Sequence, residues 1–206
     1  MTVPKNMFDT LEEEFIDLIR SSGDVFSSLV AKTEETAKLL QRDTGEAGVT
    51  IVPILSPIIT CIVEAVIETG ENITHGTKSL TYSFLYAVRD YPKNAVEIIP
   101  VLSTQIMMTN HRLKGNLPQA AKGTVSGVIK AADEIGIETK EAAAIAAMAA
   151  VKTAYEISPE MGEKVLKALS STIDGVTVVL KEFSGNKDAR NYSFNALILL
   201  IISWFH

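Results

Sequence analysis

Four titratable side chains recur at helical spacing in one short segment, where together they could hold a cation. Glu64, Glu68, Glu71 and His75 are three or four residues apart, so an unbroken helix would align them on one face. Such a face could bind a hard cation or raise the pKa of the histidine. Gly70 interrupts the segment, however, and this favours the simpler interpretation of a solvated helix edge.

A second group of side chains is basic. His111, Arg112 and Lys114 lie in the polar stretch 110–116, and we predict that Arg89 joins them in a site for an anion or an acidic protein partner. The alternative is an ordinary solvated surface. Nucleic-acid binding would require further bases with interleaved aromatic residues, which this stretch lacks, so no nucleic-acid partner is predicted.

Motifs that would place an active site are missing from the sequence. It contains no G-x-x-x-x-G-K-[ST], G-x-G-x-x-G, G-x-S-x-G or H-E-x-x-H, and no histidine follows a glutamate by three residues. Cys61 has no adjacent base, which favours a buried, inert thiol over a nucleophile. We therefore expect a protein that is not an enzyme, with no catalytic residue, no cofactor and no metal.

The composition describes a chain that can bury a large core without covalent support. Of its 206 residues, 47% are hydrophobic and 21% are charged, which is compatible with an apolar interior under a charged surface. A single cysteine cannot form an intramolecular disulfide, and this favours a reducing compartment; the predicted location is cytoplasmic.

The apolar stretch 51–67 is the segment around which the other elements must be arranged. It is apolar on nearly all sides, so its helix requires cover from several neighbours or from a membrane. Pro53 and Pro57 argue against one straight helix through both, and we expect a kink or turn near Leu55 with a new start at Ser56. The stretch is too short and too interrupted by proline for a typical membrane span.

Apolar periodicity of about 3.6 residues predicts helices along almost the whole chain. Asn116 and Ser158 are the expected N-caps of two of them, and Gly136 is expected to end the helix that Asn116 begins. An alanine-rich helix at 140–157 should lie very close to at least two neighbours. The segment 175–180 has β-branched residues, but the flanking pattern favours a helix that continues to Gly185 with a bend at Gly175. The predicted helices are 10–20, 24–42, 51–69, 72–91, 92 to the polar loop, 116–135, 140–157, 159–185 and 188–206.

The resulting fold class is all-α, a multi-helix bundle or irregular helical stack of about nine helices. We predict one domain over residues 1–206, with the polar loop 110–116 as an alternative boundary. The segments 49–56, 96–103 and 162–170 resemble one another, which is typical of stacked helical pairs, but their irregular spacing identifies no repeat family.

Three functions are compatible with this description. The first is protein–protein interaction or self-association through helical grooves or through the apolar C-terminal run 194–206. The second is binding of an apolar small molecule or lipid in a pocket between helices 51–69 and 140–157. The third is a peripheral or C-terminally anchored membrane protein; membrane contact is disfavoured, because both apolar runs are short, but it is left open.

Overall fold

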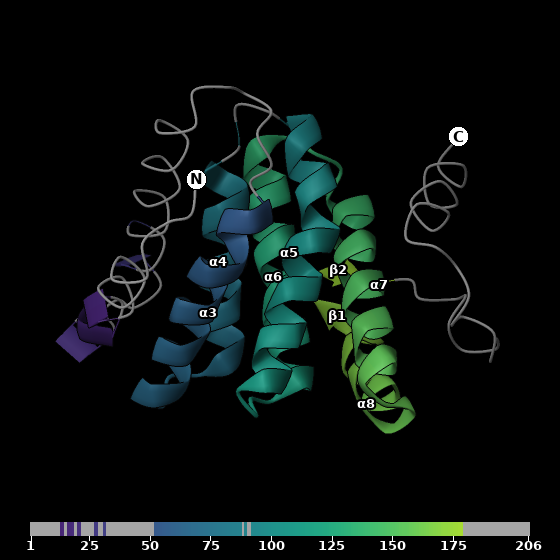
Figure 1. Cartoon of the computed structure of the whole chain (residues 1–206). Helices are drawn as coiled ribbons and strands as arrows, with labels where there is room; N and C mark the ends of the chain where they lie inside the picture. The colour runs from purple at the N-terminus through teal and green to yellow at the C-terminus, as the bar shows by residue number, and fades with distance from the viewer. Residues whose placement is uncertain are drawn as a thin grey trace.

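Helices make up nearly all of the part of the chain that the structure describes (Figure 1). The structure is a computed structural model, and it describes residues 52–87, 89 and 92–178 together with ten separate residues between 13 and 31. The all-α prediction is confirmed for these residues. The bounds of the elements are α3 Val52–Thr69, α4 Ile73–Ala87, α5 Pro92–Arg112, α6 Leu117–Ile135, α7 Thr139–Ile157, α8 Pro159–Leu169, β1 Thr172–Ile173 and β2 Val176–Thr177.

The expected number of helices is too high. In the part of the chain that the structure describes, the helices number seven rather than about nine, and six of them, α3–α8, lie in the range 52–178. The helices predicted over 24–42 and 188–206 lie almost wholly outside the described residues.

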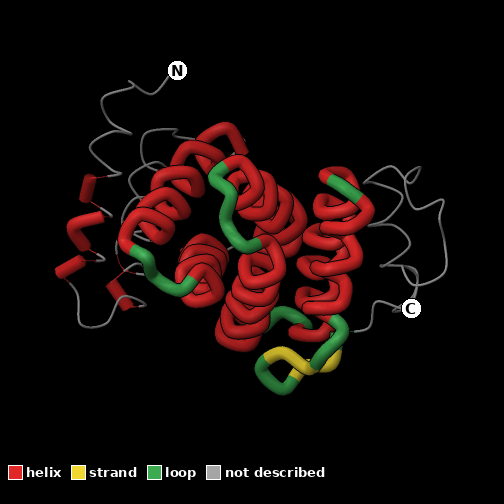
Figure 2. Tube along the Cα trace, turned by 90° about the horizontal axis from the view of Figure 1, so that it is seen from below, coloured by secondary structure: helices red, strands yellow, loops and turns green. Residues whose placement is uncertain are grey.

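Helix α6 is the centre of the bundle. It packs against α4, α5, α7 and α8, whereas α3 covers α4 and α5 at one side (Figure 1). One continuous apolar core draws residues from all six of these helices, with Ile62, Leu80, Leu102, Val128 and Val165 among its fully or almost fully buried members. Figure 2, seen from below, shows the strand pair at the edge of the bundle.

Two glycines allow α6 to approach α4 very closely. A Cβ atom added to Gly127 would lie 2.6 Å from the carbonyl oxygen of Lys78, and one added to Gly123 would collide with the carbonyl of Thr74 and the hydroxyl of Thr77. The short separation lets Thr77 Oγ1 donate to the carbonyl of Ala120 across the interface, at 3.3 Å. The tight α4–α6 pair was not predicted from the sequence.

The alanine-rich helix α7 behaves as the sequence predicts. It packs against α5, α6 and α8, and the side chains of Ala143, Ala146, Ala147 and Ala150 are fully buried. Because methyl side chains keep the helix thin, three neighbours can contact it at once. The prediction of close contact with at least two helices is therefore confirmed.

Both prolines of the central stretch lie inside one helix, so the predicted restart at Ser56 is wrong. Helix α3 extends without a break from Val52 to Thr69. Pro53 falls in the first turn, where an amide proton has no intrahelical acceptor, and only Pro57 removes a regular hydrogen bond. The apolar environment described for 59–66 stabilises the helix enough to offset that single loss.

The predicted helix to Gly185 is also wrong, because α8 ends at Leu169 and a β-hairpin follows. Thr172 pairs with Thr177 and Ile173 with Val176 in antiparallel register. Asp174 and Gly175 form the turn with φ values of 45° and 82°. Asp-Gly is a preferred pair for a two-residue hairpin turn, and the neighbouring helical periodicity obscured this signal.

The polar stretch 110–116 is only partly a loop. Helix α5 continues to Arg112, and Asn110 is completely buried. The amides of Lys114 and Gly115 then donate to the carbonyls of His111 and Asn110, at 3.0 and 2.7 Å, which is the hydrogen-bond pattern of a Schellman C-cap. The loop proper is four residues long, and the alternative domain boundary at this place stays a prediction.

Lys114 occupies the position of this cap that glycine usually fills. Its φ of 58° places a side chain in the left-handed region, which costs about 1 kcal/mol. We therefore expect Lys114→Gly to raise the free energy of unfolding by about 0.5–1 kcal/mol in urea denaturation at pH 7. Lys122→Gly, the same change at an exposed position inside α6, should lower it by a similar amount. Equal destabilisation by both variants would contradict the assignment of this cap.

Candidate binding surface

Three of the four predicted basic residues lie together at the end of α5. His111, Arg112 and Lys114 are exposed, and Arg112 Nη2 donates to Thr60 Oγ1 of α3 at 2.9 Å. The fourth, Arg89, precedes α5, whose 21 residues extend about 30 Å. The structure therefore separates Arg89 from the other three by the length of a helix.

Arg89 belongs instead to a ladder of tyrosines and cations between α4 and α6. Its guanidinium lies 4.4 Å from the centre of the Tyr86 ring, and Tyr86 stacks on Tyr82 at 5.4 Å. Lys130 of α6 lies 4.6 Å from the Tyr82 ring, and the Tyr82 hydroxyl donates to Glu134 at 2.5 Å. These contacts join the two helices and already engage both cations.

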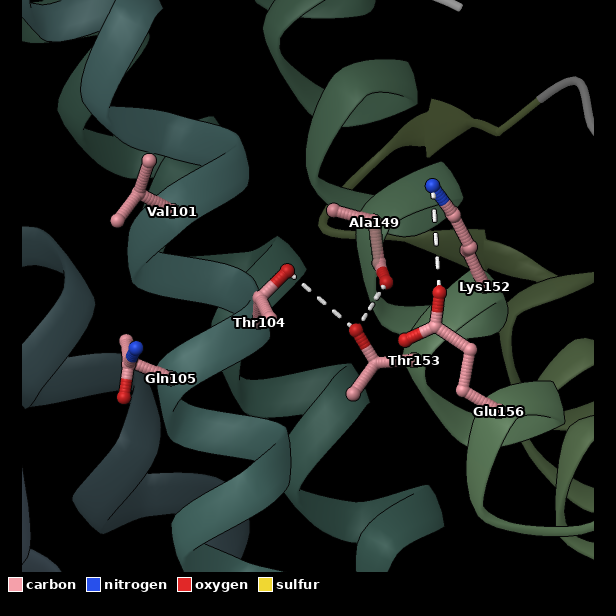
Figure 3. Close-up of a pocket in the computed structure, with 7 residues that line it drawn as sticks. All are labelled: Val101, Thr104, Gln105, Ala149, Lys152, Thr153 and Glu156. Atoms are coloured by element: carbon pink, nitrogen blue, oxygen red, sulfur yellow. Dashed lines mark hydrogen bonds and ion pairs between the residues drawn. The ribbon is translucent and has the colours of Figure 1, made fainter. Parts of the chain in front are cut away.

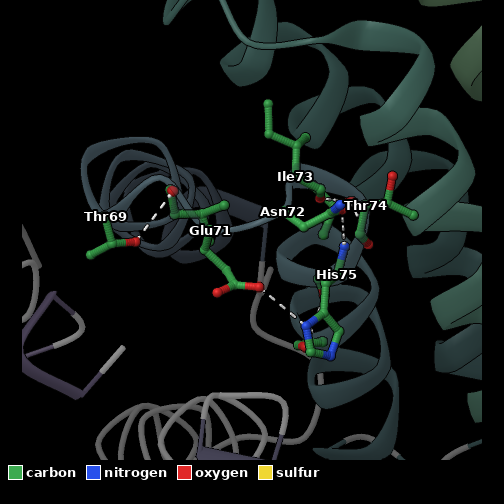
Figure 4. Close-up of polar contacts among 9 residues, drawn as sticks. Thr69, Glu71, Asn72, Ile73, Thr74 and His75 are labelled. Atoms are coloured by element: carbon green, nitrogen blue, oxygen red, sulfur yellow. Dashed lines mark hydrogen bonds and ion pairs between the residues drawn. The ribbon is translucent and has the colours of Figure 1, made fainter. Parts of the chain in front are cut away.

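The predicted acidic strip is interrupted at Gly70, as the sequence indicates. Gly70 has a φ of 71° and ends α3, and Glu71 beyond this break pairs with His75, with 3.3 Å between Oε1 and Nδ1 (Figure 4). Asn72 Oδ1 accepts from the His75 amide at 3.2 Å at the start of α4. Among the described residues no group of three potential metal ligands occurs.

Cys61 is buried, with 4% of its surface exposed. Its neighbours in α3, Ile62 and Val63, belong to the same apolar core cluster. A thiol in such surroundings is shielded from solvent oxidants and substrates. The predicted burial of Cys61 is confirmed, and its lack of reactivity stays a prediction.

An open groove between α5 and α7 is the hollow that the sequence did not reveal. Its volume is about 200 Å³, and Figure 3 shows its two walls. The residues that line it are Val101, Thr104 and Gln105 of α5, with Ala149, Lys152, Thr153 and Glu156 of α7. Within each helix these residues recur at intervals of three or four positions, so they lie on one face. The two faces form a groove because α5 and α7 pack side by side in the fold.

Most polar atoms on the walls of the groove are satisfied within the wall. Thr153 Oγ1 lies 2.9 Å from the carbonyl of Ala149 and 3.3 Å from Thr104 Oγ1. Lys152 Nζ lies 4.0 Å from Glu156 Oε1, which balances the two charges at the rim. The groove therefore offers mainly methyl groups, Val101 and aliphatic stems to a partner.

Met108 continues the α5 stripe one turn beyond the groove. It is 54% exposed and is the large hydrophobic residue that stands out at the surface of the described chain. A methionine thioether adapts its shape to different partners and is common at binding surfaces. We refer to the seven groove residues together with Met108 as the α5–α7 surface.

The hairpin is fixed to the bundle by a carboxylate that accepts from two helices. Asp174 Oδ2 accepts from Lys78 Nζ of α4 at 2.8 Å and from Ser126 Oγ of α6 at 2.5 Å. The lysine, then the serine, hold the pKa of Asp174 below its ordinary value, against a smaller opposing effect of burial. Both donors therefore converge on one carboxylate oxygen, which ties the hairpin to α4 and α6.

Replacement of Asp174 tests this attachment through its pH dependence. A depressed folded-state pKa means that the carboxylate stabilises the fold fully above its unfolded pKa of about 3.9, and that this stability is lost as pH falls through the folded value. We expect Asp174→Asn, which keeps the turn preference, to reduce the free energy of unfolding by about 1 kcal/mol at pH 7. Urea midpoints measured from pH 7 to pH 3 should begin to converge with those of the parent below about pH 4.

Glu160→Gln is the matched control for that experiment. Glu160 pairs with Lys164 at 2.7 Å on the same helix, and this pair lowers its pKa as well, but the carboxylate is fully exposed. An exposed pair within one helix contributes little, so its removal should leave the urea midpoint nearly unchanged. If the two variants behave alike, the hairpin is not held by Asp174.

Comparisons with protein family models, with curated proteins and with solved structures found no match to this chain. The described helices also contain none that is both long and apolar enough to cross a membrane.

Proposed function

We propose that this protein acts without enzymatic activity, as a helical protein that binds another protein chain through the α5–α7 surface. The observation that supports the proposal most directly is the exposed side chain of Met108. It extends a groove in which the hydroxyls of Thr104 and Thr153 already have hydrogen-bond partners within the protein. We further propose that it does so in the cytoplasm, with the single buried cysteine as support.

The shape of the α5–α7 surface favours a helix as the bound element. Two neighbouring helices leave a channel between their side-chain ridges, and the ridge of a third helix packs into such a channel. Val101, Gln105 and Met108 on one wall are spaced by four and three residues, so they present anchors to about two turns of a partner helix.

The groove is less suited to an apolar small molecule. Its volume of about 200 Å³ is below the roughly 300–1,000 Å³ typical of small-molecule sites. The pocket expected between residues 51–69 and 140–157 would need a wall from α3, whereas this groove is formed by α5 and α7. The protein partner is therefore the better supported of the two.

Self-association gives the direct test, because the probe is the chain itself. We expect light scattering of the full chain over micromolar concentrations to show a dimer, and Met108→Asp to weaken it at least 10-fold, since burying a carboxylate opposes binding. Gln119→Asp adds the same charge at an exposed position of α6 that lies beside Thr74 of α4, and it should leave the dimer unchanged. A monomer at every concentration, or equal effects of the two variants, would reject the proposal.

A further inference from the structure

The C-terminal sequence contains the kind of element that the α5–α7 surface would accept. Residues 196–205, ALILLIISWF, have one polar side chain, Ser203, and no charge. They lie outside the described residues. An apolar run of this kind requires cover from protein or membrane.

The chemistry of the groove corresponds to an uncharged apolar segment. The hydroxyls of Thr104 and Thr153 are within hydrogen-bond distance of each other, and Thr153 also reaches the carbonyl of Ala149. Lys152 and Glu156 balance each other at the rim, so no net charge opposes the approach of leucine and isoleucine side chains (Figure 3). The rim carries one charge of each sign, so its net charge does not select for a charged partner.

The lengths also agree. The wall of α5 from Val101 to Met108 and the wall of α7 from Ala149 to Glu156 are each about 10 Å long, at a rise of about 1.5 Å per residue. Residues 196–205 as a helix would extend about 15 Å, enough to cover both walls over their whole length.

The place where the described chain ends favours a segment from another copy. The strand β2 packs against α7, and in Figure 3, which faces the groove, the strands lie behind α7. A segment that follows Val178 must first pass around α7 to reach its own groove. The intervening residues 179–195 can extend roughly 55 Å, so they also reach a second molecule.

We propose that residues 196–205 of a second copy occupy the α5–α7 groove, so that two chains exchange C-terminal segments in a two-fold dimer. The proposal rests on the proposed function and specifies its partner. Reciprocal exchange covers both apolar runs and both Met108 side chains at once, and a two-fold arrangement closes without leaving an open surface for further addition.

Crosslinking between two different chains tests the exchange. In a Cys61→Ala background, full-length chains carrying Met108→Cys are mixed with full-length chains carrying Leu200→Cys and treated with a short bismaleimide. We expect a mixed dimer on a denaturing gel, identified by mass spectrometry of the linked peptides, at least 10-fold more abundant than with Gln119→Cys in place of Met108→Cys. Circular dichroism of each variant establishes that the helices are intact.

The outcomes separate this inference from the proposed function. If Met108→Asp weakens the dimer but the mixed chains crosslink no more than the Gln119→Cys control, another element occupies the groove and the exchange is rejected while the proposed function stands. A chain that is monomeric throughout rejects both. A double variant, Met108→Cys with Leu200→Cys, that links only within one chain overturns the exchange between copies.

Discussion

Gly127→Ala is expected to lower the free energy of unfolding by about 2 kcal/mol and the melting temperature by about 4–8 °C. The new Cβ atom would lie 2.6 Å from the carbonyl oxygen of Lys78 and 2.7 Å from the Cβ atom of Thr81. Neither atom is the end of a flexible side chain, so α4 and α6 must move apart. The strain exceeds the gain of about 1 kcal/mol that alanine normally brings to the interior of a helix.

The sign of the effect is what makes this substitution informative. In a helix that does not pack closely at this point, glycine to alanine would stabilise the protein. Lys122→Ala, at an exposed position of α6 before Gly127, should change the melting temperature by less than about 2 °C. A melting temperature of Gly127→Ala at or above that of the parent, measured by circular dichroism, would show that α4 and α6 are not in close contact at Gly127.

Local signals in the sequence were sufficient to place several helix ends. Asn116 Oδ1 accepts from the Gln119 amide at 3.1 Å, Ser158 Oγ accepts from the Met161 amide at 3.2 Å, and Gly136 ends α6 with a φ of 74°. Each of these is determined by residues three or four positions apart. Such short-range chemistry can be predicted because no distant part of the chain alters it.

Predictions that depended on competing local patterns were less successful. The Asp174-Gly175 pair predicts a hairpin turn, whereas the periodicity around it predicts a helix. The contacts that Asp174 receives from Lys78 and Ser126 favour the hairpin. These two partners are 96 and 48 residues away, so a local sequence pattern contains no information about their contacts with Asp174.

Separation in the sequence also explains which parts of the candidate site could be predicted. His111, Arg112 and Lys114 are neighbours in sequence, and the structure keeps them together. Arg89 was included in the predicted site only because of its charge, and the length of α5 separates it from the other three residues. The α5–α7 groove joins residues far apart in the sequence, such as Thr104 and Thr153, which are 49 positions apart, and its residues are individually unremarkable in type.

Asn110→Asp is expected to destabilise the protein by about 3–4 kcal/mol at pH 7. Asn110 is completely buried, its Nδ2 donates to the carbonyl of Ile106 at 3.0 Å, and its Oδ1 lies against Gly115 without a hydrogen-bond partner among the described residues. The substitution removes that donor and places a carboxylate beside a carbonyl oxygen. Burial would raise the pKa of the introduced carboxyl in the folded state, because the charged form loses its hydration.

The direction of the pH dependence follows from that shift. Below about pH 4 both the folded and unfolded states carry the proton, so the variant should lie closest to the parent there. Above this pH only the unfolded chain releases the proton easily, and the variant should lose up to about 1.4 kcal/mol per pH unit until the folded pKa is reached. This is the opposite of the dependence expected at Asp174, where the pKa is lowered.

Asn116→Asp provides the same chemical change six residues away with a different expected result. Asn116 is exposed and caps α6 through an oxygen that an aspartate also supplies, next to the positive end of the helix dipole. Its free energy of unfolding, from urea titrations at pH 4 and pH 7, should stay within about 0.5 kcal/mol of the parent. Because the two asparagines belong to one polar stretch, equal behaviour of the two variants would mean that α5 ends before Asn110 and that the stretch is a solvated loop after all.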